Sequence, residues 1–174
     1  IFDLCERGAR NGYRFFLLGG EEGVGARAAA KLIEKYPGLQ IVGVESPPFR
    51  EPTPDEHNRL IERIRAARPD VLLIAFGQPK GERWMYRNYR EAGVPVSVQI
   101  GASLDFAAGR VQRAPLWLQK IGMEWAYRLW LEPRRLFMRY ARNAWFILQM
   151  TSRSLISGLA GRGSKKADRT EITR

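Results

Sequence analysis

Four short and almost entirely apolar runs constrain the fold of this 174-residue chain more than any other feature. They lie at residues 13–18, 39–44, 71–76 and 94–100, and segments of helical pattern separate them. Short apolar runs without polar alternation are typical of strands covered on both faces, as in a parallel sheet. The sequence therefore predicts an α/β fold with a Rossmann-like, mostly parallel sheet and helices on both faces.

Helices are predicted between these strands, at residues 26–36, 54–67 and 82–92. Pro37 and Gly38 end the first of them, and Pro54 suits the first turn of the second. An apolar face at the start of the chain indicates one more helix and is made by Ile1, Phe2, Leu4 and Cys5. Because the chain begins inside that pattern and not at a methionine, we expect it to be N-terminally truncated.

Glycines follow three of the four predicted strands, at Gly19 and Gly20, Gly77 and Gly101. Ligands of parallel α/β sheets collect at the carboxyl ends of the strands, where glycine lets the backbone approach a diphosphate. The helix after Gly20 adds free N–H groups that bind anions. Neither the dinucleotide pattern GxGxxG nor the P-loop pattern is present, which argues against NAD and P-loop chemistry. Alternatively, these glycines only shape tight turns.

Charged side chains accompany the same strand ends. Lys80 and Glu82 follow the third strand, where Lys80 would meet a phosphate. Asp105 follows the fourth strand, where its carboxylate would accept hydrogen bonds from a base or ribose. Each has a simpler interpretation, as a surface residue for Lys80 and Glu82 and as a helix cap for Asp105.

One cysteine and one histidine limit the chemistry further. Cys5 excludes an internal disulfide and a cysteine-rich zinc site, and we expect it in the core. His57 lies in a polar stretch without a second histidine, so we expect a solvated residue at a helix start and no metal site. Histidine-based zinc chemistry and serine-triad chemistry are therefore not expected in this chain.

Positive charge is concentrated in the last third of the chain. Residues 1–109 carry 15 basic and 14 acidic side chains, whereas residues 110–174 carry 14 and 4. We therefore expect a near-neutral Rossmann-like domain at 1–109, a basic helical appendage at 110–151 and a flexible basic tail at 152–174. The helices predicted in the appendage lie at residues 116–121, 124–131 and 134–150.

Arginine and tryptophan side chains share the helical pattern of this appendage. Arg128, Arg135, Arg139 and Arg142 recur at spacings of 7, 4 and 3, so a continuous helix would place them on one stripe. Four of the five tryptophans also lie in the appendage, and no apolar run is long enough to span a bilayer. Such a surface suits phosphate binding by arginine and entry of the aromatic side into a membrane interface. The alternative is an ordinary basic face exposed to solvent.

Several stretches resemble the WecG/TagA/CpsF family of bacterial glycosyltransferases. They are Phe16-Leu-Leu-Gly-Gly, Tyr36-Pro-Gly-Leu-Gln-Ile-Val-Gly, Gly77-Gln-Pro-Lys-Gly-Glu-Arg-Trp, Gly101-Ala-Ser-Leu-Asp-Phe-Ala-Ala-Gly-Arg and Gly122-Met-Glu-Trp-Ala-Tyr-Arg-Leu-Trp. The resemblance runs from about Tyr13 to Met150, and the order and spacing of the stretches make chance a poor explanation.

The resemblance implies an inverting hexosyltransferase that moves an N-acetylmannosamine-type sugar from a UDP donor to undecaprenyl-diphosphate-linked N-acetylglucosamine. Such transfer serves the synthesis of teichoic acid or other cell-surface polysaccharide. The resemblance further implies no cofactor, no metal, and peripheral attachment to an anionic membrane surface. That surface is the cytoplasmic face of the bacterial inner membrane, and a homo-oligomer is compatible with the family.

Carried onto this chain, the resemblance assigns UDP to Gly19, Gly20 and Asp105, and the diphosphates to Arg128 and Arg135. The substrate-binding residues that we expect in all are Gly19, Gly20, Gly77, Lys80, Glu82, Gly101, Asp105, Arg128, Arg135 and Arg139.

Two departures from the family pattern bear on this expectation. Gly81 replaces the glutamine of the family's Pro-Lys-Gln-Glu turn, which is thought to contact the sugar. The family's proposed general base is an aspartate in a segment that this chain does not contain, so we expect no catalytic base here. A non-catalytic UDP-sugar-binding or membrane-tethered accessory module is therefore the alternative. Nucleic acid is not expected as a partner, because no motif for it is present.

Overall fold

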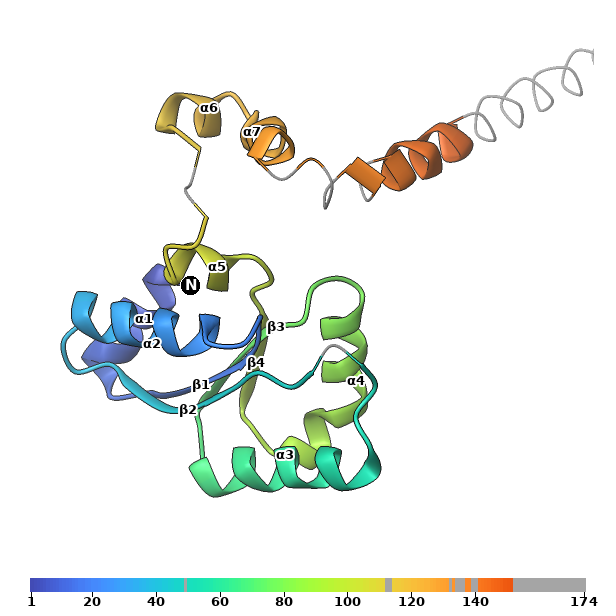
Figure 1. Cartoon of the computed structure of the whole chain (residues 1–174). Helices are drawn as coiled ribbons and strands as arrows, with labels where there is room; N and C mark the ends of the chain where they lie inside the picture. The colour runs from blue at the N-terminus through green and yellow to red at the C-terminus, as the bar shows by residue number, and fades with distance from the viewer. Residues whose placement is uncertain (49, 112–113, 132, 134–136, 139–140, 152–174) are drawn as a thin grey trace, which may run out of the picture. The chain divides into compact units, whose positions relative to one another are not determined.

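The computed structural model of the protein describes residues 1–48, 50–111, 114–131, 133, 137–138 and 141–151. It divides into two compact units, Ile1–Arg113 and Ala114–Arg174, and each is described by itself. The first unit holds a four-stranded sheet with its helices (Figure 1). Its elements are α1 (Phe2–Asn11), β1 (Arg14–Gly19), α2 (Val24–Lys35), β2 (Gln40–Glu45), α3 (Pro54–Ala67), β3 (Val71–Ala75), α4 (Lys80–Ala92), β4 (Val96–Gln99) and α5 (Ser103–Ala107).

All strand pairs of the sheet are parallel, in the order β2-β1-β3-β4. After β1 the chain goes outward to β2, and it then crosses back to form β3 on the other side of β1, where Leu17 pairs with Leu73. The winding direction therefore reverses between β1 and β3. Such a reversal leaves a crevice at the carboxyl ends of the two strands, where α/β proteins bind their ligands.

Successive side chains of each central strand point to opposite faces of the sheet and are buried there. Phe15 and Leu17 of β1 pack in a core with α1, α2 and α5, whereas Phe16 and Leu18 pack in a second core with α3 and α4. Figure 1 shows these two groups of helices on the two faces of the sheet. Because both faces are covered, the central strands can be apolar throughout, and the predicted α/β fold is confirmed.

Most predicted elements are present, with shifted ends. α3 has the predicted bounds because Thr53 caps it with a capping box and Pro54 occupies the first turn. α4 begins at Lys80, two residues before the predicted start, so Lys80 belongs to its first turn. β4 is shorter than predicted, and the short helix α5 was not predicted.

Cys5 lies in the core of the first unit, as predicted. Its side chain is 1% exposed, and burial raises the pKa of the thiol to about 11. The thiolate form is therefore scarce at neutral pH, which fits a packing residue and not a nucleophile.

The second unit contains the short helices α6 (Leu116–Lys120) and α7 (Glu124–Leu131), and residues 141–151 are helical. The prediction for 124–131 is confirmed, and the prediction for 116–121 is confirmed to within one residue. The predicted tail at 152–174 lies outside the described residues. Within the described part of the chain, no helix combines the length and the apolar character needed to cross a membrane.

Candidate functional site

The end of β1 is built from two glycines with left-handed backbone angles. Gly19 has φ 104° and Gly20 has φ 81°, values that L side chains rarely adopt. A Cβ on Gly19 would lie 2.9 Å from the carbonyl carbon of Ala75, and one on Gly20 would lie 2.9 Å from Cδ2 of Leu104. These glycines therefore do shape a tight turn, and they let the end of β1 lie against both β3 and α5.

Gly77 and Gly101 follow β3 and β4, also with positive φ, of 73° and 49°. A Cβ on either glycine would meet no atom within 4 Å. The predicted strand-end glycines thus lie at the carboxyl ends of β1, β3 and β4. Gly77 and Gly101 leave open space beside the backbone there, whereas Gly19 and Gly20 are closely packed by their neighbours.

The N-terminus of α2 follows directly from this edge. Gly23 precedes α2 in the left-handed region, and no side chain caps the helix. A Cβ on Gly25 would lie 2.6 Å from Cγ1 of Val44, so the missing side chain lets α2 approach β2 closely. The positive end of the helix, with backbone N–H groups in its first turn, therefore stands at the carboxyl end of β1. This geometry suits an anion such as a diphosphate.

Asp105 lies beside the same turn. It belongs to the first turn of α5, whose cap position is Ala102, so the helix-cap interpretation of Asp105 is wrong. Its side chain is 16% exposed and lies 3.8 Å from the guanidinium of Arg110, which also forms a 2.6 Å ion pair with Glu21. Arg110 thus links the carboxylate of Asp105 to the loop between β1 and α2.

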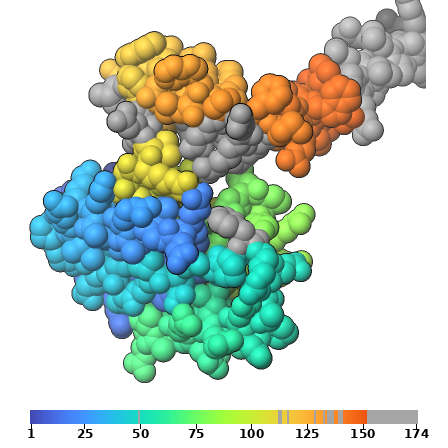
Figure 2. Space-filling view, viewed as in Figure 1, coloured from blue at the N-terminus to red at the C-terminus, as the bar shows by residue number. Residues whose placement is uncertain are grey.

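A cavity of about 650 Å³ opens on the other side of Gly20, between α3 and α4. We call it the α3–α4 pocket; Figure 2 shows the two helices, coloured teal and green, side by side on the surface of the first unit. Ligand pockets typically enclose about 300–1,000 Å³. The residues that line it are Gly20, Glu45, Ser46, Pro47, Pro48, Arg50, Glu51, Pro52, Glu56, His57, Arg59, Leu60, Arg63, Phe76, Lys80, Arg83, Trp84, Arg87 and Asn88.

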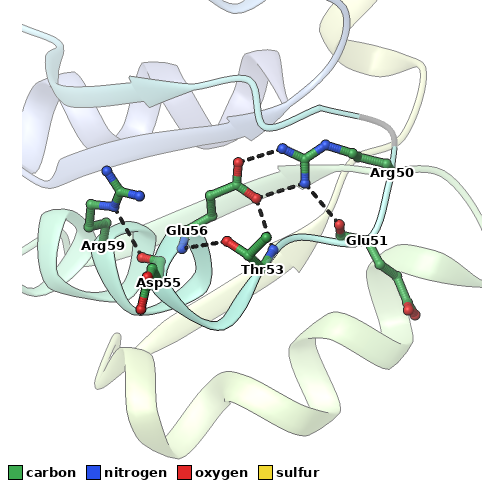
Figure 3. A network of polar contacts seen from close by, with 6 residues as sticks. All are labelled: Arg50, Glu51, Thr53, Asp55, Glu56 and Arg59. Carbon is green, nitrogen blue, oxygen red and sulfur yellow. Dashed lines mark hydrogen bonds and ion pairs between the residues drawn. The ribbon is translucent and has the colours of Figure 1, made fainter.

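One wall of this pocket is the proline-rich loop between β2 and α3, which a polar network holds to α3 (Figure 3). The guanidinium of Arg50 donates hydrogen bonds to both carboxylate oxygens of Glu56 and to the carbonyl oxygen of Glu51. The Glu56 carboxylate also accepts a 2.8 Å bond from the backbone N–H of Thr53. Arg50 is the main cause that lowers the pKa of Glu56 to about 2.

His57 lies in the first turn of α3 and lines this pocket. Its side chain is 25% exposed, and Nε2 is 3.5 Å from Oε2 of Glu91. The expected helix-start position is confirmed, but most of the side chain is covered, so the expectation of a solvated histidine is wrong. Among the described residues, no three His, Cys, Asp or Glu side chains come together as a metal site requires.

Glu82 does not line the α3–α4 pocket, although its neighbour Lys80 does. Oε2 of Glu82 and both polar atoms of the Gln99 amide are buried, without a hydrogen-bond partner among the described residues. A Cβ on Gly81 would lie only 2.2 Å from Nε2 of Gln99. The Gln99 amide thus fills the space that a side chain at position 81 would take, which explains why glycine is accommodated there.

The structure brings some predicted site residues together and leaves others undescribed. Gly19, Gly20 and Asp105 gather at the end of β1, and Lys80 lies across Gly20 in the α3–α4 pocket. The backbone of Arg128 belongs to α7, but its side chain lies outside the described residues, as do Arg135 and Arg139.

Two arginines that line the α3–α4 pocket were missed at the sequence level. Arg83 and Arg87 follow Lys80 at spacings of 3 and 4, which place all three on one side of α4. That spacing was visible in the sequence.

Comparisons with known proteins give a family and a relative of this chain. A family model described as "Glycosyl transferase WecG/TagA/CpsF family" matches residues 1–158. The N-acetylglucosaminyldiphosphoundecaprenol N-acetyl-beta-D-mannosaminyltransferase of Bacillus subtilis (strain 168) is 32% identical over 123 residues. That match covers 70% of this chain and 46% of the relative, so the chain spans about half the length of the protein it matches.

Proposed function

The chain belongs to the WecG/TagA/CpsF family of glycosyltransferases, and from this premise we propose that it acts in glycosyl transfer from a UDP-sugar. The donor carries an N-acetylmannosamine-type sugar, and the acceptor is N-acetylglucosamine linked to undecaprenyl diphosphate. The name of the Bacillus relative supports this choice of sugars and lipid. The product serves the synthesis of teichoic acid or another cell-surface polysaccharide.

One observation carries the donor assignment: the uncapped N-terminus of α2 at the glycine turn that ends β1. Backbone N–H groups in the first turn of α2 bind the UDP diphosphate, and the turn at Gly19 and Gly20 leads the chain from β1 to this helix end. Asp105, held beside this turn through Arg110, accepts hydrogen bonds from the ribose or base. Gly77 and Gly101 leave open space along the same edge for the sugar.

The reaction inverts the anomeric carbon. A hydroxyl oxygen of the acceptor forms a bond to this carbon, and the bond from the carbon to the β-phosphate oxygen of UDP breaks. UDP leaves with the electron pair, and the hydroxyl proton passes to a base. The growing negative charge on UDP lies at the positive end of α2, which stabilises the transition state more than the bound donor.

No carboxylate at this edge is assigned as that base. Arg110 lies beside Asp105, Arg63 pairs with Glu45, and Arg50 pairs with Glu56. Of these, Glu56 has its pKa lowered to about 2, mainly by Arg50, so its carboxylate is a poor proton acceptor. The second candidate function is a UDP-sugar-binding or membrane-tethered accessory module that does not catalyse transfer.

The second unit carries the side chains that we propose to contact the membrane. Trp117, Trp125, Trp130 and Trp145 are all more than half exposed, and apolar side chains of residues 146–148 are exposed beside Trp145. Aromatic rings of this kind favour the interface of a bilayer. We place the protein peripherally on the anionic cytoplasmic face of the bacterial inner membrane, where Arg128, Arg135 and Arg139 meet substrate diphosphates. A homo-oligomer is compatible with this arrangement.

Calorimetry with UDP, uridine monophosphate and uridine tests the donor site. We expect UDP to bind most tightly, because the α2 N-terminus acts on the diphosphate, and Asp105→Asn to weaken all three ligands. A chain that binds none of them contradicts the proposed function. Transfer from UDP-N-acetylmannosamine to a short-chain lipid-diphosphate acceptor then separates the candidates: product indicates the enzyme, and UDP binding without product indicates the accessory module.

A further inference from the structure

The α3–α4 pocket carries more positive charge than its own carboxylates neutralise. Its acidic residues are Glu45, Glu51 and Glu56, and its basic residues besides His57 are Arg50, Arg59, Arg63, Lys80, Arg83 and Arg87. Two of the three carboxylates are already occupied, since Glu45 pairs with Arg63 and Glu56 with Arg50. The excess charge therefore lies on the α4 wall and on Arg59.

Arg83 and Arg87 make no ion pair within the described part of the chain. Both are exposed and line the pocket from the same side of α4 as Lys80. Like charges gathered in a concave surface repel each other and raise the local potential, so such a site attracts anions. Guanidinium groups in particular match phosphate oxygens with two parallel hydrogen bonds.

The rest of the pocket has room and surface for a sugar beside a phosphate. Its volume of about 650 Å³ exceeds what an isolated phosphate needs. Trp84 and Phe76 line it as an edge-to-face pair, with ring centroids 5.9 Å apart. Aromatic rings give an apolar surface for the C–H face of a sugar ring, while cations at the rim hold charged groups.

The pocket also lies next to the donor site and shares Gly20 with it. Gly20 lines the pocket, and the same residue packs against Leu104 of α5, on the side of Asp105. A transfer between two diphosphate-bearing substrates needs two neighbouring diphosphate sites. Two such sites that share one glycine turn would bring donor and acceptor together at that turn.

We propose that the α3–α4 pocket binds the diphosphate of the sugar-diphosphate acceptor, through Arg83 and Arg87. This inference rests on the proposed function, which assigns the UDP diphosphate to the N-terminus of α2. The sugar of the acceptor then lies against Trp84, and the reacting hydroxyl group of that sugar points toward Gly20 and the donor. The donor also carries a diphosphate, and the experiment distinguishes binding of the donor in this pocket from binding of the acceptor.

The experiment measures two dissociation constants on the full chain by calorimetry, one for UDP and one for a water-soluble short-alkyl diphosphate ester of N-acetylglucosamine. The test variant is Arg83→Gln/Arg87→Gln. The control, Arg10→Gln/Arg90→Gln, removes the same charge from two exposed arginines that do not line the pocket. Thermal unfolding midpoints of parent, test and control verify that all three are folded.

We expect the test variant to weaken ester binding about tenfold or more, since two charge-assisted contacts are lost. UDP binding should stay close to that of the control. Weaker UDP binding with unchanged ester binding overturns the proposal and assigns the pocket to the donor. Equal losses for both ligands, or losses no larger than in the control, overturn it as well. A parent chain that binds UDP but not the ester overturns this proposal alone, whereas one that binds no UDP contradicts the proposed function.

Discussion

Replacing Gly25 by alanine tests how closely the N-terminus of α2 must approach the sheet. Gly25 lies in the first turn of α2 at an ordinary helical backbone conformation, so alanine introduces no backbone strain. The added Cβ would, however, lie 2.6 Å from Cγ1 of Val44. Because Val44 is β-branched and has few rotamers, α2 must move away from β2.

The expected change in the free energy of unfolding follows from two opposing effects. Overpacking of this kind costs about 1–3 kcal/mol, while the better helix propensity of alanine returns up to about 1 kcal/mol. With an overpacking cost of about 2 kcal/mol, the middle of that range, Gly25→Ala should lower the free energy of unfolding by about 1–2 kcal/mol. In a Val44→Ala background the clash is absent, so the same change should be neutral or stabilising by up to about 1 kcal/mol.

Urea unfolding of the parent, the two single variants and the double variant measures this coupling, with UDP affinity measured on the same four proteins. We expect the destabilisation by Gly25→Ala to disappear in the Val44→Ala background, with UDP affinity lost in Gly25→Ala and recovered in the double variant. Additive free energies would refute the reasoning, because contacting residues must couple when one relieves the clash of the other.

Three further changes give separate tests. Since Arg50 holds the pKa of Glu56 at about 2, below its ordinary 4.5, the loop contact should be complete above pH 4.5 and lost as the pH falls toward 2. Carboxyl NMR titration should show this low midpoint, Arg50→Ala should raise it, and an ordinary midpoint in the parent would contradict the network. Burial raises the pKa of the Cys5 thiol to about 11, so a thiol reagent at pH 8 should react only in denaturant; fast reaction of the native chain would disprove its burial. Gly81→Ala should cost less stability in a Gln99→Ala background than in the parent, because alanine and the Gln99 amide compete for one space. Equal cost in both backgrounds would show that they do not.

Much of the fold could be predicted because local pattern and tertiary burial agree. The central strands β1 and β3 are apolar on both faces, and Thr53 with Pro54 marks the start of α3 unambiguously. α5 escaped prediction because only five residues are helical and Leu104 joins the core by tertiary packing. Among the described residues β4 pairs with β3 alone, and it begins after Pro95, which has no N–H to donate.

The sequence could predict only those parts of the candidate site that lie at the end of a single strand. Glycines after parallel strands meet at one edge of a sheet, so Gly19 and Gly77 could be placed from the sequence. The α3–α4 pocket depends on the distance between two helices joined through β3, and local sequence patterns do not fix that distance. Likewise, nothing in the sequence pairs Gly81 with Gln99, because that contact depends on how α4 packs against β4.

Binding of the UDP diphosphate at the N-terminus of α2 can be followed by amide NMR of the ¹⁵N-labelled chain during titration with UDP. We expect the largest shift changes at Gly20, Gly25 and their neighbours in the first turn of α2. We expect none at the opposite edge of the sheet, around Asp70. Shift changes that gather at that opposite edge, or that leave the first turn of α2 unmoved while UDP saturates the protein, would contradict it.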